Sequence, residues 1–152
     1  MKKLDLNKKK IAIIWYWIEG KSSLSFLYKN LNTTKNIDIL DKNPISKIDF
    51  FEWKIITWDS YLSDLDKYDY IFLSPWISPY TNDLIKYKDK ILNQTKLFFE
   101  NYSGKIISIT ATKWKSTSST LIYQLLKNAW YKVKLVWNIW TPVLDEINLD
   151  NS

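Results

Sequence analysis

Short apolar runs alternate with segments of helical spacing along most of the chain. Runs rich in Ile, Leu and aromatic residues predict strands at residues 10–14, 37–40, 54–57, 68–74 and 90–92. Between these runs, helical spacing predicts helices at about 19–31, 81–88 and 94–102, the first of which would bury Leu24, Phe26, Leu27 and Leu31. Because strands and helices alternate, the pattern favours an α/β fold built on a parallel, doubly wound sheet.

A second strand, loop and helix follow from residue 104 onward. Residues 105–110 predict a buried strand, and residues 116–128 predict a helix with Leu121, Ile122, Leu125 and Leu126 at helical spacing. The Ser and Thr at the start of this helix stand where N-caps belong. Between the two elements the chain reads Thr112-Lys113-Trp114-Lys115-Ser116-Thr117. A strand, a tight loop and then Lys-Ser-Thr is the layout of a phosphate-binding loop, in which the Lys neutralises phosphate and the next hydroxyl holds Mg²⁺.

One residue of this loop does not fit. A phosphate-binding loop needs Gly at position 114, where the backbone turns tightly and approaches the phosphate, and the chain has Trp114 there. The same mismatch recurs after the first predicted strand, where W-Y-W-I-E-G becomes Gly-x-Gly-x-x-Gly if Trp15 and Trp17 are Gly. An acidic residue, Asp41, then follows about 20 positions later, as the dinucleotide-binding fingerprint requires.

The Gly and Trp contents support one explanation. The chain has 2 Gly and 9 Trp, whereas a typical soluble domain of this length has about 11 Gly. Five of the other six Trp also follow strands or helices, at turn or cap positions: Trp58, Trp76, Trp130, Trp137 and Trp140. We hypothesise that most of these Trp stand where the natural protein has Gly, because UGA is read as Gly in some bacterial lineages and as Trp in other codes. The alternative is a protein that is naturally rich in Trp.

Composition excludes several classes of site. The net charge is +6, but all 22 basic residues are Lys, whereas nucleic-acid readout favours Arg, so we expect a solvated lysine-rich surface and no nucleic-acid partner. The chain has no Cys and no His, which excludes disulfides, thiolate metal sites and a histidine base. The apolar run at 11–18 is too short to span a membrane and lacks a cleavage site, so we expect a cytoplasmic protein without membrane insertion.

Four segments, in order and spacing, resemble the Mur ligase family: IAIIWYWIEGKSSLSF, LSPWIS, ISITATKWKSTSSTL and LVWNIWTPVLDE. The resemblance covers about residues 10–145 and is closest to the members that add D-glutamate to UDP-N-acetylmuramoyl-L-alanine. It implies a Rossmann-like UDP-sugar-binding domain over 1–93, a linker helix over 94–103, and the start of a P-loop ATPase-type central domain over 104–152. It also implies ATP and Mg²⁺ as cofactors, an acyl-phosphate intermediate, a role in peptidoglycan synthesis, and a monomer.

The resemblance assigns roles to particular residues of this chain. Lys115 would be catalytic and Ser116 would hold Mg²⁺. The residues expected to bind ATP are Thr112, Lys113, Trp114, Lys115, Ser116 and Thr117. The residues expected to bind the UDP-sugar are Trp15, Trp17, Ile18, Glu19, Gly20, Asp41, Ser74, Pro75, Trp76 and Asn138.

Three features depart from the family pattern. Ala111 and Lys113 replace the Gly and Asn that are usual in the ATP loop, and Glu19 places a carboxylate close to the expected pyrophosphate. The family also continues for several hundred residues, so we expect this chain to be an inactive fragment. Two alternatives remain open. One is a general NAD- or nucleotide-sugar-binding Rossmann protein, and the other is a Trp- and Lys-rich module that stacks bases or lies at a membrane interface.

Overall fold

A five-stranded parallel sheet forms the centre of the fold. The computed structural model describes residues 6–30, 36–45, 54–136 and 142–146. The strands are β1 (Ile11–Ile14), β2 (Ile37–Asp41), β3 (Ile55–Thr57), β4 (Tyr70–Leu73) and β5 (Ile91–Leu92). They lie in the order β3-β2-β1-β4-β5, and every neighbouring pair is parallel. The sequence prediction of a parallel, Rossmann-like α/β sheet is therefore confirmed, and each of its five strands lies within a predicted run or extends one by a single residue.

Strands β1 and β4 are apolar on both sides because both faces of the sheet are covered. In β1, Ile11 and Ile13 belong to one core cluster with Leu24 and Leu27 of helix α1 (Ile18–Asn30). The alternate residues of β1 pack in a second cluster on the other face, with residues of the segments that flank β4. A strand covered on both faces reads as a continuous apolar run, which is the pattern that the sequence shows.

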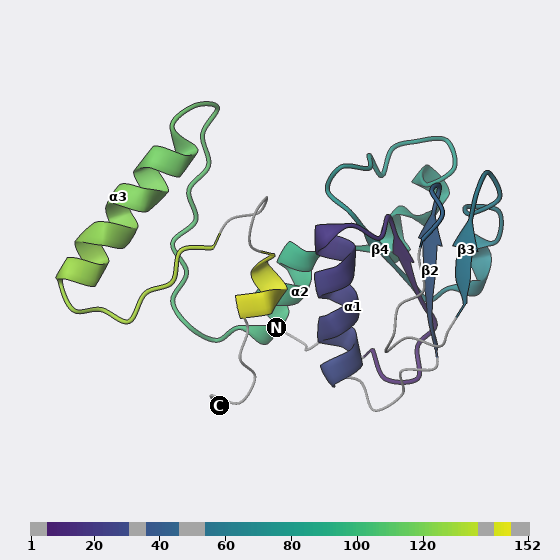
Figure 1. Cartoon of the computed structure of the whole chain (residues 1–152), viewed down its shortest axis with the longest axis horizontal. Helices are drawn as coiled ribbons and strands as arrows, with labels where there is room; N and C mark the ends of the chain where they lie inside the picture. Colours follow the sequence, from purple (N-terminus) through teal and green to yellow (C-terminus); the bar gives the residue numbers. More distant parts are fainter. Residues whose placement is uncertain (1–5, 31–35, 46–53, 137–141, 147–152) are drawn as a thin grey trace.

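Two helices, α1 and α2 (Gln94–Asn101), lie on the same side of the sheet (Figure 1). Helix α2 begins where the Asn93 side chain accepts a hydrogen bond from the Lys96 N–H, at 2.8 Å. A short turn of 3₁₀-helix, η4 (Val143–Glu146), packs against both helices and buries Leu144. Helices at 19–31 and 94–102 are thus confirmed, while Leu31 lies outside the described residues.

The predicted helix at 81–88 is wrong. The chain there forms turns and the 3₁₀-helix η3 (Ile85–Lys90), which together with η2 (Leu65–Lys67) covers the second face of the sheet. Leu84 and Tyr87 are both buried, and their spacing of three residues matches the repeat of a 3₁₀-helix. One short turn therefore buries both side chains where an α-helix was predicted.

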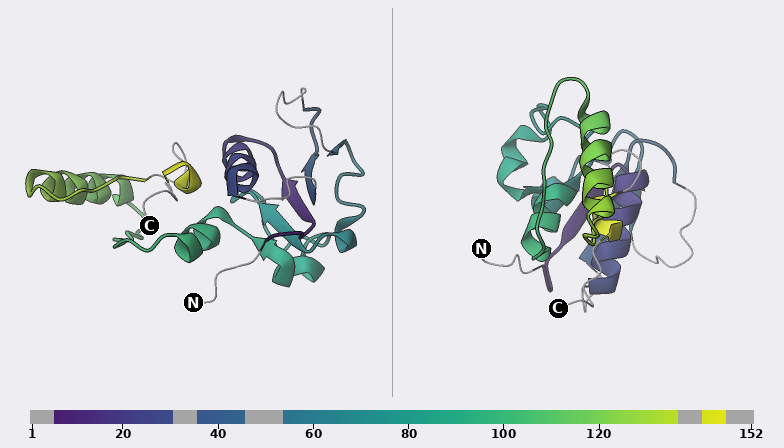
Figure 2. Two further views of the ribbon diagram at one scale, coloured as in Figure 1. Left: turned by 90° about the horizontal axis from the view of Figure 1, so that it is seen from below. Right: turned by 90° about the vertical axis from the view of Figure 1, so that its left-hand side faces the viewer.

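The segment after α2 differs most from the prediction. Residues 105–110 form no strand and are mostly exposed, so the predicted buried strand is wrong. The described residues 131–136 likewise form no strand. The predicted helix is confirmed as α3 (Lys115–Asn128), but none of its residues is buried, and it lies away from the sheet (Figures 1 and 2). A strand needs a neighbouring strand to pair its backbone groups, and no described segment lies beside residues 105–110 to do so.

Candidate functional site

The candidate site lies at the carboxyl ends of β1 and β4. The order of the strands reverses there, because the chain moves from β1 to β2 and β3 on one side and to β4 and β5 on the other. In open parallel sheets, the loops leave this point in opposite directions and open a crevice in which ligands bind. The structure brings to this edge two of the predicted segments, residues 15–20 after β1 and residues 74–76 after β4, and places Asp41 at the end of the adjacent β2.

The loop after β1 has the backbone geometry of a glycine-rich phosphate loop. Trp15 has a positive φ of 70°, and its N–H donates to the Leu40 carbonyl at 2.9 Å. Gly20, in the first turn of α1, lies so close to this loop that an added Cβ would be 2.5 Å from the Trp15 carbonyl oxygen. In the dinucleotide-binding fingerprint, the first Gly makes the tight turn and the third permits close helix–strand packing, and positions 15 and 20 do so here.

Asp41 fixes this loop. Its carboxylate is buried and accepts two backbone hydrogen bonds at 2.8 Å, one at Oδ2 from Tyr16 and one at Oδ1 from Asn43. The sequence analysis predicted that Asp41 contacts the ligand. In the structure, Asp41 lies at the same edge of the sheet as the crevice. Its oxygens, however, hold the loop between β1 and α1 in place. This positioning role depends on a contact between residues 25 apart and had no signal in the sequence.

A small cavity of about 10 Å³ lies beneath the crevice, which is room for about one water molecule. Two polar atoms that line it, Glu19 Oε2 and Ser74 Oγ, are buried and have no hydrogen-bond partner. Burying a polar atom without a partner is unfavourable, so this cavity suits a polar group that bridges the two. Both residues are among the predicted site residues.

Sequence reasoning missed Gln94 in this cavity. Its side-chain N–H₂ donates to the Glu19 carbonyl at 2.7 Å and to the Ser23 hydroxyl at 2.9 Å, and its side chain is buried. A polar residue at a helix start after a short strand was the available signal. The partners, more than 70 residues away, follow only from the packing of α2 against α1.

The remaining predicted residues at this edge lie on its rim. Pro75 is exposed, and Trp17 and Trp76 are 51% and 55% exposed, respectively. Trp76 lies in a turn that the Ile77 N–H closes by donating to the Ser74 carbonyl at 3.0 Å. Ile18 is the first residue of α1. Asn138 lies outside the described residues.

The predicted ATP-binding residues form a separate group at the start of α3. Residues 111–117, which include Thr112, Lys113 and Thr117, are all exposed, and Lys115 and Ser116 are the first two residues of the helix. The N-cap is Trp114, not the predicted Ser or Thr, and its side chain makes no capping bond. The free N–H groups of the first helical turn and the Lys115 ammonium suit an anion, and the Ser116 hydroxyl is of a type that ligates Mg²⁺. Among the described residues, no three acidic, His or Cys side chains are grouped to hold a metal ion.

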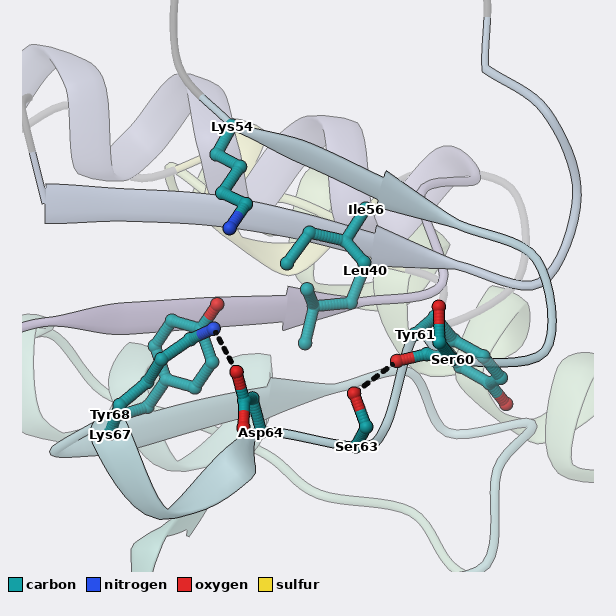
Figure 3. A pocket seen from close by; sticks show the side chains of 9 residues that line it. All are labelled: Leu40, Lys54, Ile56, Ser60, Tyr61, Ser63, Asp64, Lys67 and Tyr68. Atoms are coloured by element: carbon teal, nitrogen blue, oxygen red, sulfur yellow. Dashed lines mark hydrogen bonds and ion pairs between the residues drawn. The ribbon is translucent and has the colours of Figure 1, made fainter.

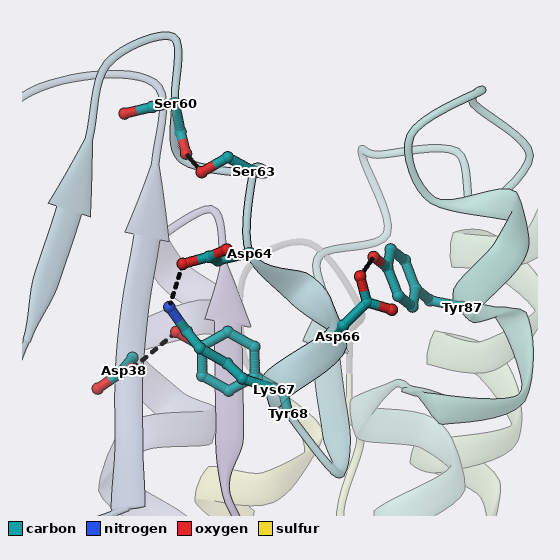
Figure 4. A network of polar contacts seen from close by, with 8 residues as sticks. All are labelled: Asp38, Ser60, Ser63, Asp64, Asp66, Lys67, Tyr68 and Tyr87. Carbon is teal, nitrogen blue, oxygen red and sulfur yellow. Dashed lines mark hydrogen bonds and ion pairs between the residues drawn. The ribbon is translucent and has the colours of Figure 1, made fainter.

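A larger cavity of about 140 Å³ lies at the side of β2 and β3 (Figure 3). The polar network beside it ties segments of the fold together (Figure 4). Tyr68 donates to Asp38 Oδ2 at 2.7 Å, and burial together with this bond raises the pKa of Tyr68. Tyr87 donates to Asp66 at 2.8 Å and lowers the pKa of that carboxyl. Since these groups satisfy one another, we interpret the network as structural, and the sequence analysis singled out none of them.

The chain is 33% identical over 150 residues to the UDP-N-acetylmuramoylalanine–D-glutamate ligase of Francisella philomiragia, covering 93% of the chain and 32% of the relative. It is 26% identical over 152 residues to the enzyme of that name from Acetivibrio thermocellus, covering 95% and 33%. The chain is a homologue of these MurD ligases. No family model matches it.

The comparisons confirm the resemblance that the four sequence segments indicated. The chain spans about a third of the length of the MurD relatives that it matches, and the parallel sheet agrees with a Rossmann-like domain of MurD homologues. In the part of the chain that the structure describes, no helix combines the length and apolar character needed to cross a membrane. The assignment of residues to individual ligands, and the division into domains at 1–93, 94–103 and 104–152, stay predictions.

Proposed function

We propose that this chain is part of a cytoplasmic, monomeric ligase of peptidoglycan precursor synthesis, which adds D-glutamate to UDP-N-acetylmuramoyl-L-alanine with ATP. The similarity to MurD ligases over more than nine-tenths of the chain supports the reaction class. The observation that carries the proposal is the crevice between β1 and β4, where a glycine-type loop and two unpartnered polar side chains meet. This part of the chain would bind the UDP-sugar.

The crevice offers groups of complementary chemistry to a nucleotide sugar. The first N–H groups of α1 point toward its N-terminal end and favour a pyrophosphate. Ser74 Oγ can donate to a phosphate or sugar oxygen, whereas the Glu19 carboxylate requires a donor such as a ligand hydroxyl or N–H. We therefore place the pyrophosphate nearer Ser74 than Glu19, because the negatively charged pyrophosphate and the Glu19 carboxylate would repel each other.

The start of α3 would serve the ATP half of the reaction. Lys115 would neutralise the transferred phosphate and orient it toward the substrate carboxylate, and Ser116 would contribute an oxygen ligand to the metal. Mg²⁺, when bound, would screen the charge of the phosphates. Transfer of the γ-phosphoryl group from ATP to the substrate carboxylate would form an acyl phosphate and release ADP. Attack of the D-glutamate amine on the acyl phosphate would then form the amide bond and release phosphate and a proton.

The second candidate, an NAD-binding Rossmann protein, shares the loop after β1. In that class, the acid after the second strand binds the ribose hydroxyl. Here both oxygens of Asp41 accept backbone N–H groups that hold the loop, so this carboxylate alone does not favour NAD, and the similarity to the MurD relatives favours the nucleotide sugar.

Calorimetry distinguishes the two candidates. The chain, and a variant with Trp15→Gly and Trp17→Gly, would be titrated with UDP-N-acetylmuramoyl-L-alanine and with NADH. We expect binding of the UDP-sugar, weakened about 10-fold by Ser74→Ala because one hydrogen bond to a charged group is lost. Ser103→Ala, at an exposed position outside the crevice, is the matched control. Binding of NADH without binding of the UDP-sugar by either protein would contradict the proposal.

The ATP half is tested in a chain extended to the full length of the MurD relatives. Lys115→Ala should abolish ATP-dependent ligation and leave UDP-sugar binding unchanged, because Lys115 lies outside the crevice between β1 and β4. Lys127→Ala, at the other end of the same helix, is the matched control. Normal turnover in the Lys115→Ala protein would remove the proposed role of this residue.

A further inference from the structure

Five described residues other than Gly have a left-handed backbone, and four of them are tryptophans. The φ angles are 70° at Trp15, 72° at Trp58, 65° at Trp114 and 63° at Trp130, and the fifth residue is Lys8. The structure describes six tryptophans, so only Trp17 and Trp76 have φ angles outside this region. Neither of the two Gly residues has a positive φ. Among the described residues, left-handed backbone therefore falls on Trp at four of five positions.

A tryptophan is among the residues least suited to this backbone region. In the left-handed conformation, the Cβ atom lies too close to the following carbonyl oxygen, and a bulky side chain makes such a position a genuine outlier. Asn and Asp are the residues, other than Gly, that adopt it most readily. The chain has many Asn and Asp residues, yet no described one occupies such a position.

The surroundings require the left-handed turn at Trp15. Its N–H extends the pairing of β1 with β2 by donating to Leu40, and its carbonyl accepts from the Trp17 N–H at 3.1 Å. The same carbonyl packs against Gly20 of α1. Because the backbone of Trp15 is held on both sides, it cannot relax to a negative φ without breaking the junction between strand and helix.

Trp130 occupies the position that Gly most often takes after a helix. The Trp130 N–H donates to the Lys127 carbonyl at 3.1 Å, and the Tyr131 N–H donates to the Leu126 carbonyl at 3.0 Å. This pair of bonds is the Schellman motif, whose left-handed residue is usually Gly. The motif satisfies the last carbonyls of α3, and its geometry depends on the positive φ of Trp130.

Burial does not compensate for the strain. The side chains of Trp58, Trp114 and Trp130 are 64%, 75% and 95% exposed. Apolar burial is the main favourable contribution that a large aromatic side chain makes, and these three bury little surface. Only Trp15 is partly buried. Backbone bonding thus imposes the left-handed turns at Trp15 and Trp130, and burial of the indole ring adds little stability at Trp58, Trp114 and Trp130.

We propose that glycine is the natural residue at positions 15, 58, 114 and 130, and that Trp stands there because UGA codons for Gly were translated as Trp. This inference rests on backbone geometry and does not depend on the proposed ligase function. It also accounts for four of the 9 Trp in a chain of 152 residues that contains only 2 Gly. With Gly at positions 15 and 114, the indole side chain would be absent from the left-handed turn of each loop.

The coding sequence and the natural protein test the proposal directly. We expect UGA codons at all four positions, and Gly at the same positions in peptides of the protein from its source organism, read by tandem mass spectrometry. A UGG codon or a Trp-containing peptide at any of these positions overturns the proposal for that position.

Stability measurements test the physical reasoning. A protein with Trp15→Gly and Trp58→Gly should have a folded-to-unfolded ratio at least about 5-fold higher than the literal chain, because left-handed strain is relieved at two positions. The matched control carries Trp17→Gly and Trp76→Gly, at exposed positions with ordinary φ, and should show no such increase. Trp15→Ala should also show none, because its Cβ remains. Equal effects of the two double variants, or of Ala and Gly at position 15, would overturn the reasoning.

If the chain with all nine Trp does not fold, the two double variants still test the proposal. The protein with Trp15→Gly and Trp58→Gly should then give the dispersed amide spectrum of a folded sheet, whereas the control pair should not. A folded spectrum from the control pair alone would overturn the proposal.

Discussion

Replacing Asp41 by Asn tests whether this carboxylate holds the loop after β1. The carboxylate accepts N–H groups from Tyr16 and Asn43, both at 2.8 Å, and is 6% exposed. An Asn side chain has one acceptor oxygen and one donor group, so it can satisfy only one of the two N–H groups. The other N–H would face a second donor in a buried site.

The expected loss follows from these two contacts. A hydrogen bond to a charged group contributes about 1.5–3 kcal/mol, and a buried N–H left without a partner costs about 1–3 kcal/mol. The two values describe the same broken contact and are not added. We therefore expect Asp41→Asn to lower the free energy of unfolding by about 2–3 kcal/mol. In a unit of about 100 residues, this corresponds to a fall in Tm of about 8–24 °C.

Urea unfolding at neutral pH, followed by circular dichroism, measures the loss, and hydrogen exchange locates it. We expect faster exchange of the Tyr16 amide, because its acceptor is weakened. Asp59→Asn is the matched control, since Asp59 is exposed in the turn after β3. If Asp41→Asn is as stable as this control, or if the Tyr16 amide exchanges at an unchanged rate, Asp41 does not hold the loop.

Two further predictions concern packing and the buried polar network. Gly20→Ala should lower the free energy of unfolding by about 1–3 kcal/mol, because the new Cβ would overlap the Trp15 carbonyl. Lys29→Ala, on the exposed face of the same helix, should change the free energy of unfolding little. Thermal unfolding measures both changes. Tyr68→Phe should cost about 2–3 kcal/mol at neutral pH, because it removes the 2.7 Å bond to Asp38 and leaves that carboxylate buried. Since the pKa of Tyr68 is raised in the folded state, its contribution to the free energy of unfolding is complete below about pH 10 and is lost at higher pH. Urea titrations should therefore show a smaller loss of stability at alkaline pH in Tyr68→Phe than in the parent. An equal loss in the two proteins would contradict this.

Local pattern determined the sheet and its helices. The runs that became β1 and β4 are apolar or aromatic at every position, and a run of this kind has few stable arrangements other than a strand covered on both faces. Helix α2 was readable because its spacing and its Asn93 cap are properties of neighbouring residues. The glycine-type turns at positions 15, 114 and 130 were also readable from their places at the ends of strands and helices.

Contacts between distant segments decided the rest. Residues 105–110 have the composition of a buried strand, but a strand forms only beside another strand, and none lies next to them in the described structure. The turn at Leu84 and Tyr87 became 3₁₀-helix because the face of the sheet offered space for one short turn. In the same way, the sequence predicted Asp41, Glu19 and Ser74 as site residues, but only the folded structure shows that Asp41 holds the loop and that the other two line a cavity. Side-chain partners depend on which elements pack together, and local sequence does not specify that packing.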